Sequence, residues 1–103
     1  MRKIEYTDLK NLNDFEKYGD KFTKIYADDE NHIYIYKRVS RYGVAAFELV
    51  KGVKAKNPDG SIVYRYPSSE QFGISGWYIM DNDRARDRIS WLMKNKLFYF
   101  NFF

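Results

Sequence analysis

Aromatic side chains constrain this sequence more strongly than any other feature. Of its 103 residues, 10 are tyrosine, 8 are phenylalanine and 2 are tryptophan, an aromatic share of 19%. Rings of this size need a packed interior, which excludes an intrinsically disordered chain. A chain of this length buries roughly two-thirds of its unfolded surface on folding. We therefore expect a single domain that spans residues 1–103.

The residue types that carry most catalytic and metal chemistry are scarce. The sequence has no cysteine, which excludes disulfides and thiolate zinc sites. Its one histidine, His32, argues strongly against histidine metal clusters and Ser-His-Asp triads, and nothing in the spacing supplies a nucleophile for it to activate. Its glycines stand singly, so it has no glycine-rich phosphate loop. The run from Asp81 to Asp83 is not a calcium loop, because Ala85 and Arg86 occupy the places of the next oxygen ligand and of the required glycine. We predict no catalytic residue, no metal site and no cofactor, and hence a protein that is not an enzyme.

The first part of the chain predicts a helix followed by two strands. Apolar side chains recur at helical spacing between residues 7 and 18, and Gly19 follows as a stop signal, so we expect a short amphipathic helix there. Residues 22–26 and 32–37 are rich in β-branched and aromatic side chains and flank an acidic turn. This pattern predicts a β-hairpin.

The middle of the chain predicts two more strands and a tight turn. Residues 44–53 alternate between two faces as a third strand does. The Asn-Pro-Asp-Gly sequence at 57–60 is typical of a β-turn, after which residues 62–66 should fold back on the third strand. Pro67 ends this fourth strand, and the Ser-Ser-Glu-Gln sequence at 68–71 has the spacing of a capping box that opens about one helical turn.

The last third predicts a strand, a helix and an unusual terminal segment. Residues 77–80 indicate a fifth strand, and Asp81 or Asp83 can cap a helix over residues 84–95. The inward stripe of this helix consists of Ala85, Ile89, Leu92 and Met93. Five of the seven residues at 97–103 are aromatic, which solvent exposure does not explain. We expect a strand there that is either central in the sheet or buried in a homodimer through Phe98, Phe100 and Phe102.

Together these elements predict an α+β fold. Its expected parts are an antiparallel meander of four to five strands, an N-terminal helix, a packed C-terminal helix and the terminal aromatic strand. The first residues lack the apolar stretch of a signal peptide, and no window reaches the ~18 apolar residues of a membrane helix. We expect a cytoplasmic protein without a membrane partner.

Charge is distributed unevenly along the chain. Residues 1–30 carry 6 basic and 8 acidic side chains, whereas residues 37–56 carry 6 basic side chains against one acidic. This basic middle is either a solvated sheet face or a surface that steers an acidic partner. In the second interpretation Arg38, Arg41, Lys51, Lys54 and Lys56 attract the partner, and Tyr34, Tyr36 and Tyr64 anchor it.

A second candidate surface lies on the predicted C-terminal helix. Arg84, Arg88 and Trp91 recur at spacings of four and three residues, which puts two guanidinium groups and an indole on one helix face. Such a face can contact phosphates and stack on bases, so nucleic acid is the alternative partner. The structural interpretation is that Arg88 covers Trp91 by a cation–π contact while the indole borders the core.

Three segments resemble small uncharacterised proteins of phages and mobile elements of gut Bacteroidota. They are Phe-Glu-Leu-Val-Lys-Gly-Val at 47–53, Asn-Pro-Asp-Gly-Ser at 57–61 and Tyr-Arg-Tyr-Pro-Ser-Ser-Glu-Gln-Phe-Gly at 64–73. The resemblance covers about residues 44–92 and implies a genomic setting rather than a set of catalytic residues. Proteins in that setting often bind a host protein as inhibitors of defence, anti-CRISPR factors among them. We therefore expect a non-enzymatic accessory protein that binds a host macromolecule, foremost a protein.

Overall fold

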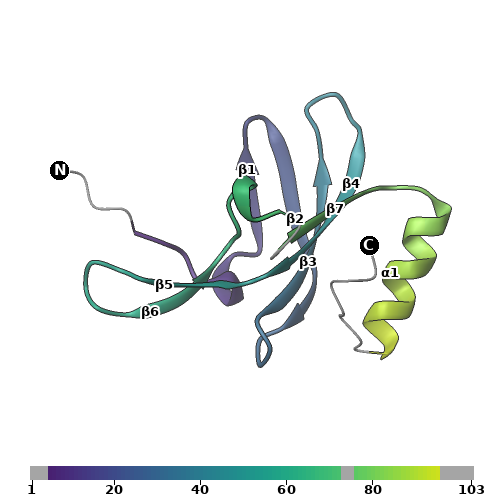
Figure 1. Ribbon diagram of the computed structural model, residues 1–103. Coiled ribbons are helices and arrows are strands. Elements are labelled where there is room, and N and C mark those ends of the chain that lie inside the picture. The colour runs from purple at the N-terminus through teal and green to yellow at the C-terminus, as the bar shows by residue number, and fades with distance from the viewer. Residues whose placement is uncertain (1–4, 73–75, 96–103) are drawn as a thin grey trace.

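The computed structural model describes residues 5–72 and 76–95 of the chain. Most of these residues belong to strands, and one α-helix follows the last strand (Figure 1). In chain order the elements are η1 (Leu9–Asn11), β1 (Asp14–Lys17), β2 (Asp20–Asp28), β3 (Ile33–Val39), β4 (Ala45–Lys51), β5 (Val53–Lys56), β6 (Ile62–Arg65), η2 (Ser69–Gln71), β7 (Gly76–Met80) and α1 (Asp83–Asn95).

Five of the strands form one antiparallel sheet in the order β1-β2-β3-β4-β7. The first four are neighbours in both sequence and space, so the predicted meander and the coarse α+β class are confirmed. The remaining two strands, β5 and β6, pair only with each other and extend away from the main sheet (Figure 1). We call this hairpin, Val53 to Arg65, the β5–β6 arm.

The predicted N-terminal helix is wrong. The structure has only the single turn η1 and then strand β1, which pairs with β2 through Lys17 and Asp20. Tyr18 and Gly19 form the two-residue connection at φ of 56° and 83°, the positive values that a tight hairpin turn requires. Apolar residues spaced three apart fit a helical pattern. The strand pair forms instead because it brings aromatic side chains into contact, and these contacts outweigh the local helical preference.

The predicted third strand is interrupted at Gly52, and its two halves enter different sheets. The amide of Gly52 donates to the carbonyl of His32 at 2.7 Å, and a Cβ on this glycine would lie 2.6 Å from Tyr64 Cβ. Consequently residues 62–65 pair with β5 rather than with β4, whose outer neighbour is β7. The turn at 57–60 forms as predicted, with Gly60 at a φ of 90° and its amide donating to Asn57.

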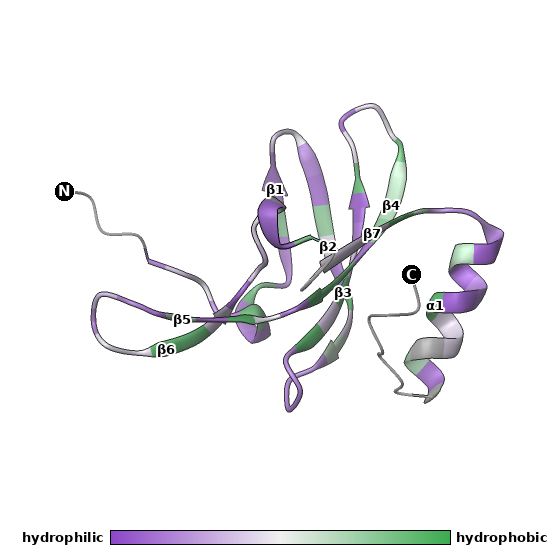
Figure 2. Ribbon diagram, viewed as in Figure 1, coloured by the Kyte–Doolittle hydropathy of each residue, from purple (hydrophilic) through white to green (hydrophobic). Residues whose placement is uncertain are grey.

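Strand β4 is the centre of the core. Its residues from Ala46 to Val50 are all buried, so both faces of the sheet are covered. Figure 2 shows hydrophobic stretches along β3 and β4, whereas the turn between β2 and β3 is hydrophilic. On one face the core contains Ile35, Phe47, Leu49, Ala85 and Ile89, and on the other Leu9, Phe22, Tyr34, Tyr36 and Val50.

Helix α1 forms as predicted, but with another cap. Asn82 accepts the amide of Ala85 at 2.9 Å, and Asp81 instead pairs with Arg86 at 2.6 Å. The predicted capping box is confirmed as the 3-10 turn η2, where the Gln71 side chain accepts the Ser68 amide at 2.9 Å. No helix in the described ranges has the length and apolar character needed to cross a membrane. The predicted strand and dimer contact at Phe98, Phe100 and Phe102 lie outside the described residues and stay predictions.

Candidate functional site

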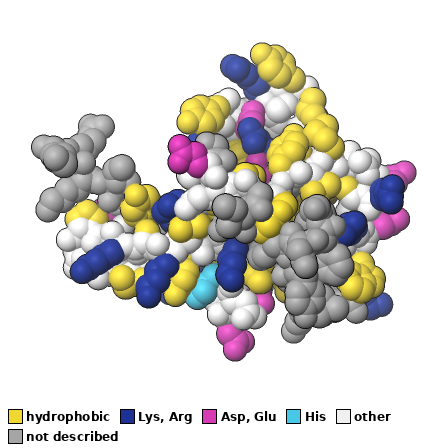
Figure 3. All heavy atoms as spheres, in the orientation of Figure 1, with side chains coloured by type: hydrophobic (Ala, Val, Ile, Leu, Met, Phe, Trp, Pro, Cys, Tyr) yellow, Lys and Arg dark blue, Asp and Glu magenta, His cyan; other side chains and the backbone are white. Residues whose placement is uncertain are grey.

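A groove of about 690 Å³ opens on the face of the sheet opposite α1. Strands β1 and β2 and residues 66–68 form its walls, and β3, β4 and β7 form its floor. Much of the lining is aromatic: Tyr6, Phe15, Tyr18, Phe22, Tyr66, Phe72 and Tyr78. We call it the aromatic groove, and Figure 3 shows its upper part as a hollow in which charged side chains lie between hydrophobic ones.

The wall of the aromatic groove is fixed by ring contacts. Phe15 stacks on Phe22 with 4.4 Å between ring centroids and an interplanar angle of 7°. Tyr66 meets the edges of both rings, at 5.6 Å from Phe15 and 6.2 Å from Phe22. Tyr36, fully buried, lies 5.3 Å from Tyr66. Such offset and edge-to-face pairs hold the wall in one arrangement before any ligand arrives.

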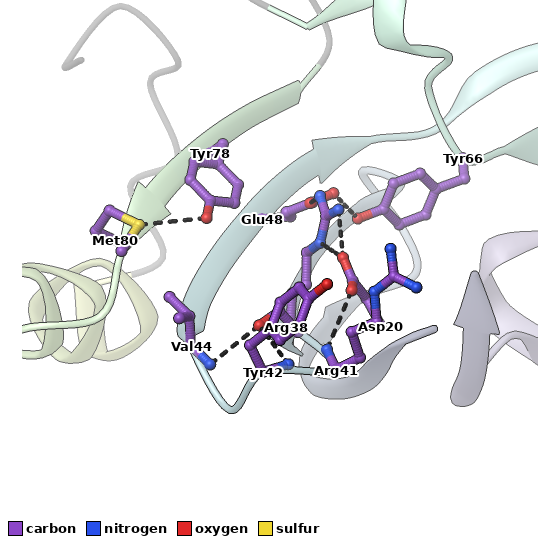
Figure 4. Close-up of polar contacts among 10 residues, drawn as sticks. Asp20, Arg38, Arg41, Tyr42, Val44, Glu48, Tyr66, Tyr78 and Met80 are labelled. Carbon is purple, nitrogen blue, oxygen red and sulfur yellow. Dashed lines mark hydrogen bonds and ion pairs between the residues drawn. The ribbon is translucent and has the colours of Figure 1, made fainter. Parts of the chain in front are cut away.

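The floor holds a network of charged groups centred on Arg38 (Figure 4). The guanidinium donates to Asp20 Oδ2 from Nε at 2.8 Å and from Nη2 at 2.5 Å, and to Glu48 Oε2 from Nη1 at 2.7 Å. The other oxygen of Glu48 accepts the hydroxyl of Tyr66 at 2.6 Å. The backbone amide of Arg41 donates to Asp20 Oδ1 at 3.4 Å. Every carboxylate oxygen of the network therefore has a protein donor.

The environment of this network maintains its charges. Burial opposes the charge of Arg38, but hydrogen bonds to Glu48 and Asp20 outweigh burial and raise the pKa of the guanidinium. The bond from Arg38 lowers the pKa of the Asp20 carboxyl. Burial, reinforced by the Glu48 carboxylate, raises the pKa of the Tyr66 hydroxyl, so this phenol stays neutral as a donor. Asp20 and Glu48 outnumber the guanidinium of Arg38, but Lys17 and Arg65 along the lining and Arg41 near Asp20 offset their negative charge.

Arg38 also lies between two aromatic rings. Its guanidinium carbon is 5.2 Å from the ring centroid of Phe22 and 5.8 Å from that of Tyr78, within cation–π range. Because Phe22, Arg38 and Tyr78 come from β2, β3 and β7, these contacts tie three strands together across the floor.

Large apolar side chains remain exposed around the upper rim. Tyr18 in the β1–β2 turn is 82% exposed, and Tyr78 and Met80 on β7 are 49% and 48% exposed. Tyr42 and Val44, in and after the β3–β4 turn, are also exposed, and Ser40 Oγ accepts both of their amides. Figure 3 shows hydrophobic side chains gathered over the two turns at the top of the molecule. Apolar patches of this kind mark interaction surfaces when they border a hollow.

The structure divides the predicted partner-binding residues among different places. Tyr34 and Tyr36 are fully buried, so the prediction that they anchor a partner at the surface has to be corrected. They are core residues, and their hydroxyls donate to Asp29 and to the carbonyl of Leu12. Their strand is covered on both faces, which alternation on a single strand could not reveal.

The basic residues of the prediction do not form one surface. Arg38 lies in the groove floor, and Arg41 lies exposed in the β3–β4 turn. Lys54 and Lys56 are exposed on the β5–β6 arm, and Lys51 is exposed at the end of β4. Tyr64 on the arm is half-buried, and its ring stacks on His32 with 3.5 Å between centroids.

The residues of the predicted nucleic-acid surface lie on α1, on the side of the sheet away from the aromatic groove. Arg84 and Arg88 are exposed, and Trp91 is 49% exposed, while Ala85 and Ile89 of the same helix face the core. The predicted inward stripe is thus confirmed for Ala85, Ile89 and Met93, while the side chain of Leu92 lies outside the described part of the structure.

Sequence reasoning missed the groove and its network. Glu48 was one available signal, because a carboxylate in the middle of an otherwise apolar strand needs a cation and hydrogen-bond donors. Phe15 was assigned to a helix, and the return of Tyr66 over the sheet depends on where the β5–β6 arm ends. Neither the place of Phe15 on β1 nor the place of Tyr66 over the sheet follows from the local sequence pattern.

The hydrogen bonds of the network join β2, β3, β4 and the segment after β6. Its carboxylate oxygens are occupied, and within residues 5–72 and 76–95 no group of three acidic or histidine side chains is arranged to hold a metal ion. What the groove offers is a preformed aromatic surface with charged groups at its base. Comparison of the chain with models of protein families, with curated proteins and with solved structures found no match to any of them.

Proposed function

We propose that this chain is a non-enzymatic accessory protein of a phage or mobile element, and that it binds a host protein through the aromatic groove. The observation that carries the proposal is a preformed groove lined by Arg38 and by the exposed Tyr18 and Tyr78, with the exposed Met80 in contact with Tyr78. Tyrosine, methionine and arginine are enriched at protein–protein interfaces, and tyrosine and arginine dominate their hot spots. A rigid aromatic wall lowers the ordering cost of binding.

The shape and charge of the groove favour an extended segment of the partner. Its apolar walls suit aromatic or aliphatic side chains, while Lys17 and Arg65 line it and Arg41 stands beside it. Glu5 is the one carboxylate among the described lining residues apart from Glu48, which is engaged with Arg38. We infer a partner segment in which acidic residues flank an apolar one, because the basic side chains at the margin then guide its approach.

The resemblance to proteins of phages and mobile elements supports a host protein as the partner. Inhibitors of bacterial defence, such as anti-CRISPR proteins, commonly act by occupying a surface of their target, and a small binding domain suffices for this. We propose inhibition of a defence protein as the biological role.

Affinity capture from a Bacteroidota lysate, followed by calorimetry with the purified partner, tests the proposal. We expect one stoichiometric partner, and an affinity that falls by about tenfold or more when Tyr18→Ala or Tyr78→Ala is used. Trp91→Ala is the matched control, because Trp91 has the same exposed fraction as Tyr78, 49%, but lies on α1. The affinity of the Trp91→Ala variant should stay within about twofold of the original, which corresponds to about 0.4 kcal/mol of binding free energy.

Two results would overturn the proposal. One is the recovery of no stoichiometric partner from lysates of susceptible hosts. The other is a loss of affinity for Trp91→Ala that equals or exceeds the loss for the two groove variants, because the contact would then lie on α1.

A further inference from the structure

We propose that the β5–β6 arm is a second binding surface, and that its lysine-bearing face contacts the phosphate backbone of a nucleic-acid duplex. This site is separate from the aromatic groove and uses different residues. It assigns the nucleic-acid role to the arm rather than to α1.

The lysines of the arm are placed where they can contact phosphates. Lys54 and Lys56 are two residues apart on β5, so they share one face, about 6.7 Å apart along the strand. Lys51 is exposed just before the arm begins. None of the three forms an ion pair with a described carboxylate. The acidic residue nearest in sequence, Asp59 in the turn, accepts from the amide and hydroxyl of Ser61 instead.

The shape of the arm also suits a duplex. It is a two-stranded antiparallel ribbon that extends away from the main sheet, and Figure 3 shows dark-blue basic side chains along it. A ribbon of this width can enter the major groove of a duplex. Residues beside it hold it in place, since Asn57 exchanges two hydrogen bonds with the backbone of Tyr6, and Asp8 accepts the amide of Tyr64.

Two features of the arm favour a duplex over a single strand and over a protein. Proteins that hold single strands stack bases on free aromatic rings, but the Tyr64 ring on this face is already stacked on His32. Lysine is depleted in protein–protein interfaces, whereas it is a common contact to phosphates. The acidic turn at 28–30 is adjacent in sequence to His32, so the duplex contacts should be confined to the lysine-bearing part of the arm.

Salt-dependent binding of a labelled DNA duplex tests this proposal directly. If Lys54 and Lys56 neutralise phosphates, the logarithm of the binding constant should fall with the logarithm of salt concentration with a slope of about −1.8 between about 50 and 200 mM salt. The variant Lys54→Gln/Lys56→Gln should reduce the magnitude of the slope by about 1.8. The matched control is Arg84→Gln/Arg88→Gln, which removes the same charge from α1 and should leave the slope unchanged. Thermal unfolding confirms that all variants are folded.

Four results would overturn the proposal. The first is the absence of duplex binding at about 50 mM salt, and the second is an equal reduction of the salt slope in both double variants. The third is tighter binding of a single strand than of the duplex. The fourth is a lysine variant that loses host-protein binding rather than DNA binding. The last result would show that the arm contacts the protein partner. If the lysine variant loses DNA binding but still binds the host protein, the proposal for the aromatic groove is unaffected.

Discussion

Glu48 shows how one residue shapes the candidate site. Its side chain is 3% exposed and lies in the middle of the most buried strand, yet it is charged. Arg38 and Tyr66 satisfy its two oxygens, and in doing so they bring β3 and the segment after β6 over the same floor. The same carboxylate therefore stabilises the fold and positions a wall of the aromatic groove.

The substitution Glu48→Gln tests this role. It removes a buried charge from Arg38, but Arg38 is 32% exposed and keeps its hydrogen bonds to Asp20. The free energy of unfolding should therefore fall by about 1–3 kcal/mol, the cost of weakening hydrogen bonds between charged groups. Chemical denaturation measures the change. The control is Asp83→Asn, which removes a fully exposed carboxylate 3.9 Å from Arg86 and should change stability little. Equal effects for the two variants would contradict a special role for the floor network.

The buried tyrosines predict how stability depends on high pH. Burial raises the pKa values of Tyr34, Tyr36 and Tyr66 above the ordinary 10.0 of tyrosine. A raised folded-state pKa stabilises the protein fully below the unfolded-state pKa, and this stabilisation is lost as pH rises above it. We expect cooperative unfolding above pH 10, with these phenols ionising only as the chain unfolds. Phenolate absorbance recorded together with circular dichroism checks this, and complete ionisation of all tyrosines in a chain that remains folded would contradict it.

At the scale of elements, the break at Gly52 decides the architecture. It separates β4, which belongs to the core sheet, from the β5–β6 arm, and it gives Tyr64 room to stack on His32. The arm then returns the chain over the sheet at Tyr66. Without the break, residues 44–56 would form one long strand and the wall of the groove would not exist.

Gly52→Ala should therefore destabilise the protein. The added Cβ would meet Tyr64 Cβ at 2.6 Å, and forcing an extra carbon into a packed contact costs about 1–3 kcal/mol. The midpoint of denaturation measures the loss, with Ala55→Gly in the neighbouring strand as a control for the change in size. Unchanged stability of Gly52→Ala would show that the two halves of the strand are not held apart by this contact.

Sequence pattern predicted most strands because their alternation and turn chemistry are local. The hairpin of β2 and β3, the turn at 57–60, β7 and α1 all follow from residues close in sequence. The first helix was wrong because Phe15 pairs with Phe22 across a tight turn, a contact that helical spacing does not reveal. The groove was missed because Arg38 and Tyr66 meet at Glu48 only after the arm has returned the chain to the sheet.

At the scale of the whole molecule, the two faces of the sheet have different roles. One face is closed by α1 and supplies the apolar core with Phe47 and Leu49. The other is closed only in part, by Tyr66 and Phe72, and its open remainder is the aromatic groove. The β5–β6 arm extends beside it with its lysines (Figure 1). This asymmetry is the basis of our proposal that the groove is the protein-binding face.

Mapping of amide chemical shifts in the complex with the captured host partner tests that claim most directly. We predict that the largest changes fall in β2, β3 and β7 around Phe22, Arg38 and Tyr78, and that the outward face of α1 at Arg84 and Arg88 stays unchanged. Changes centred on α1, with the groove residues unaffected, would contradict it.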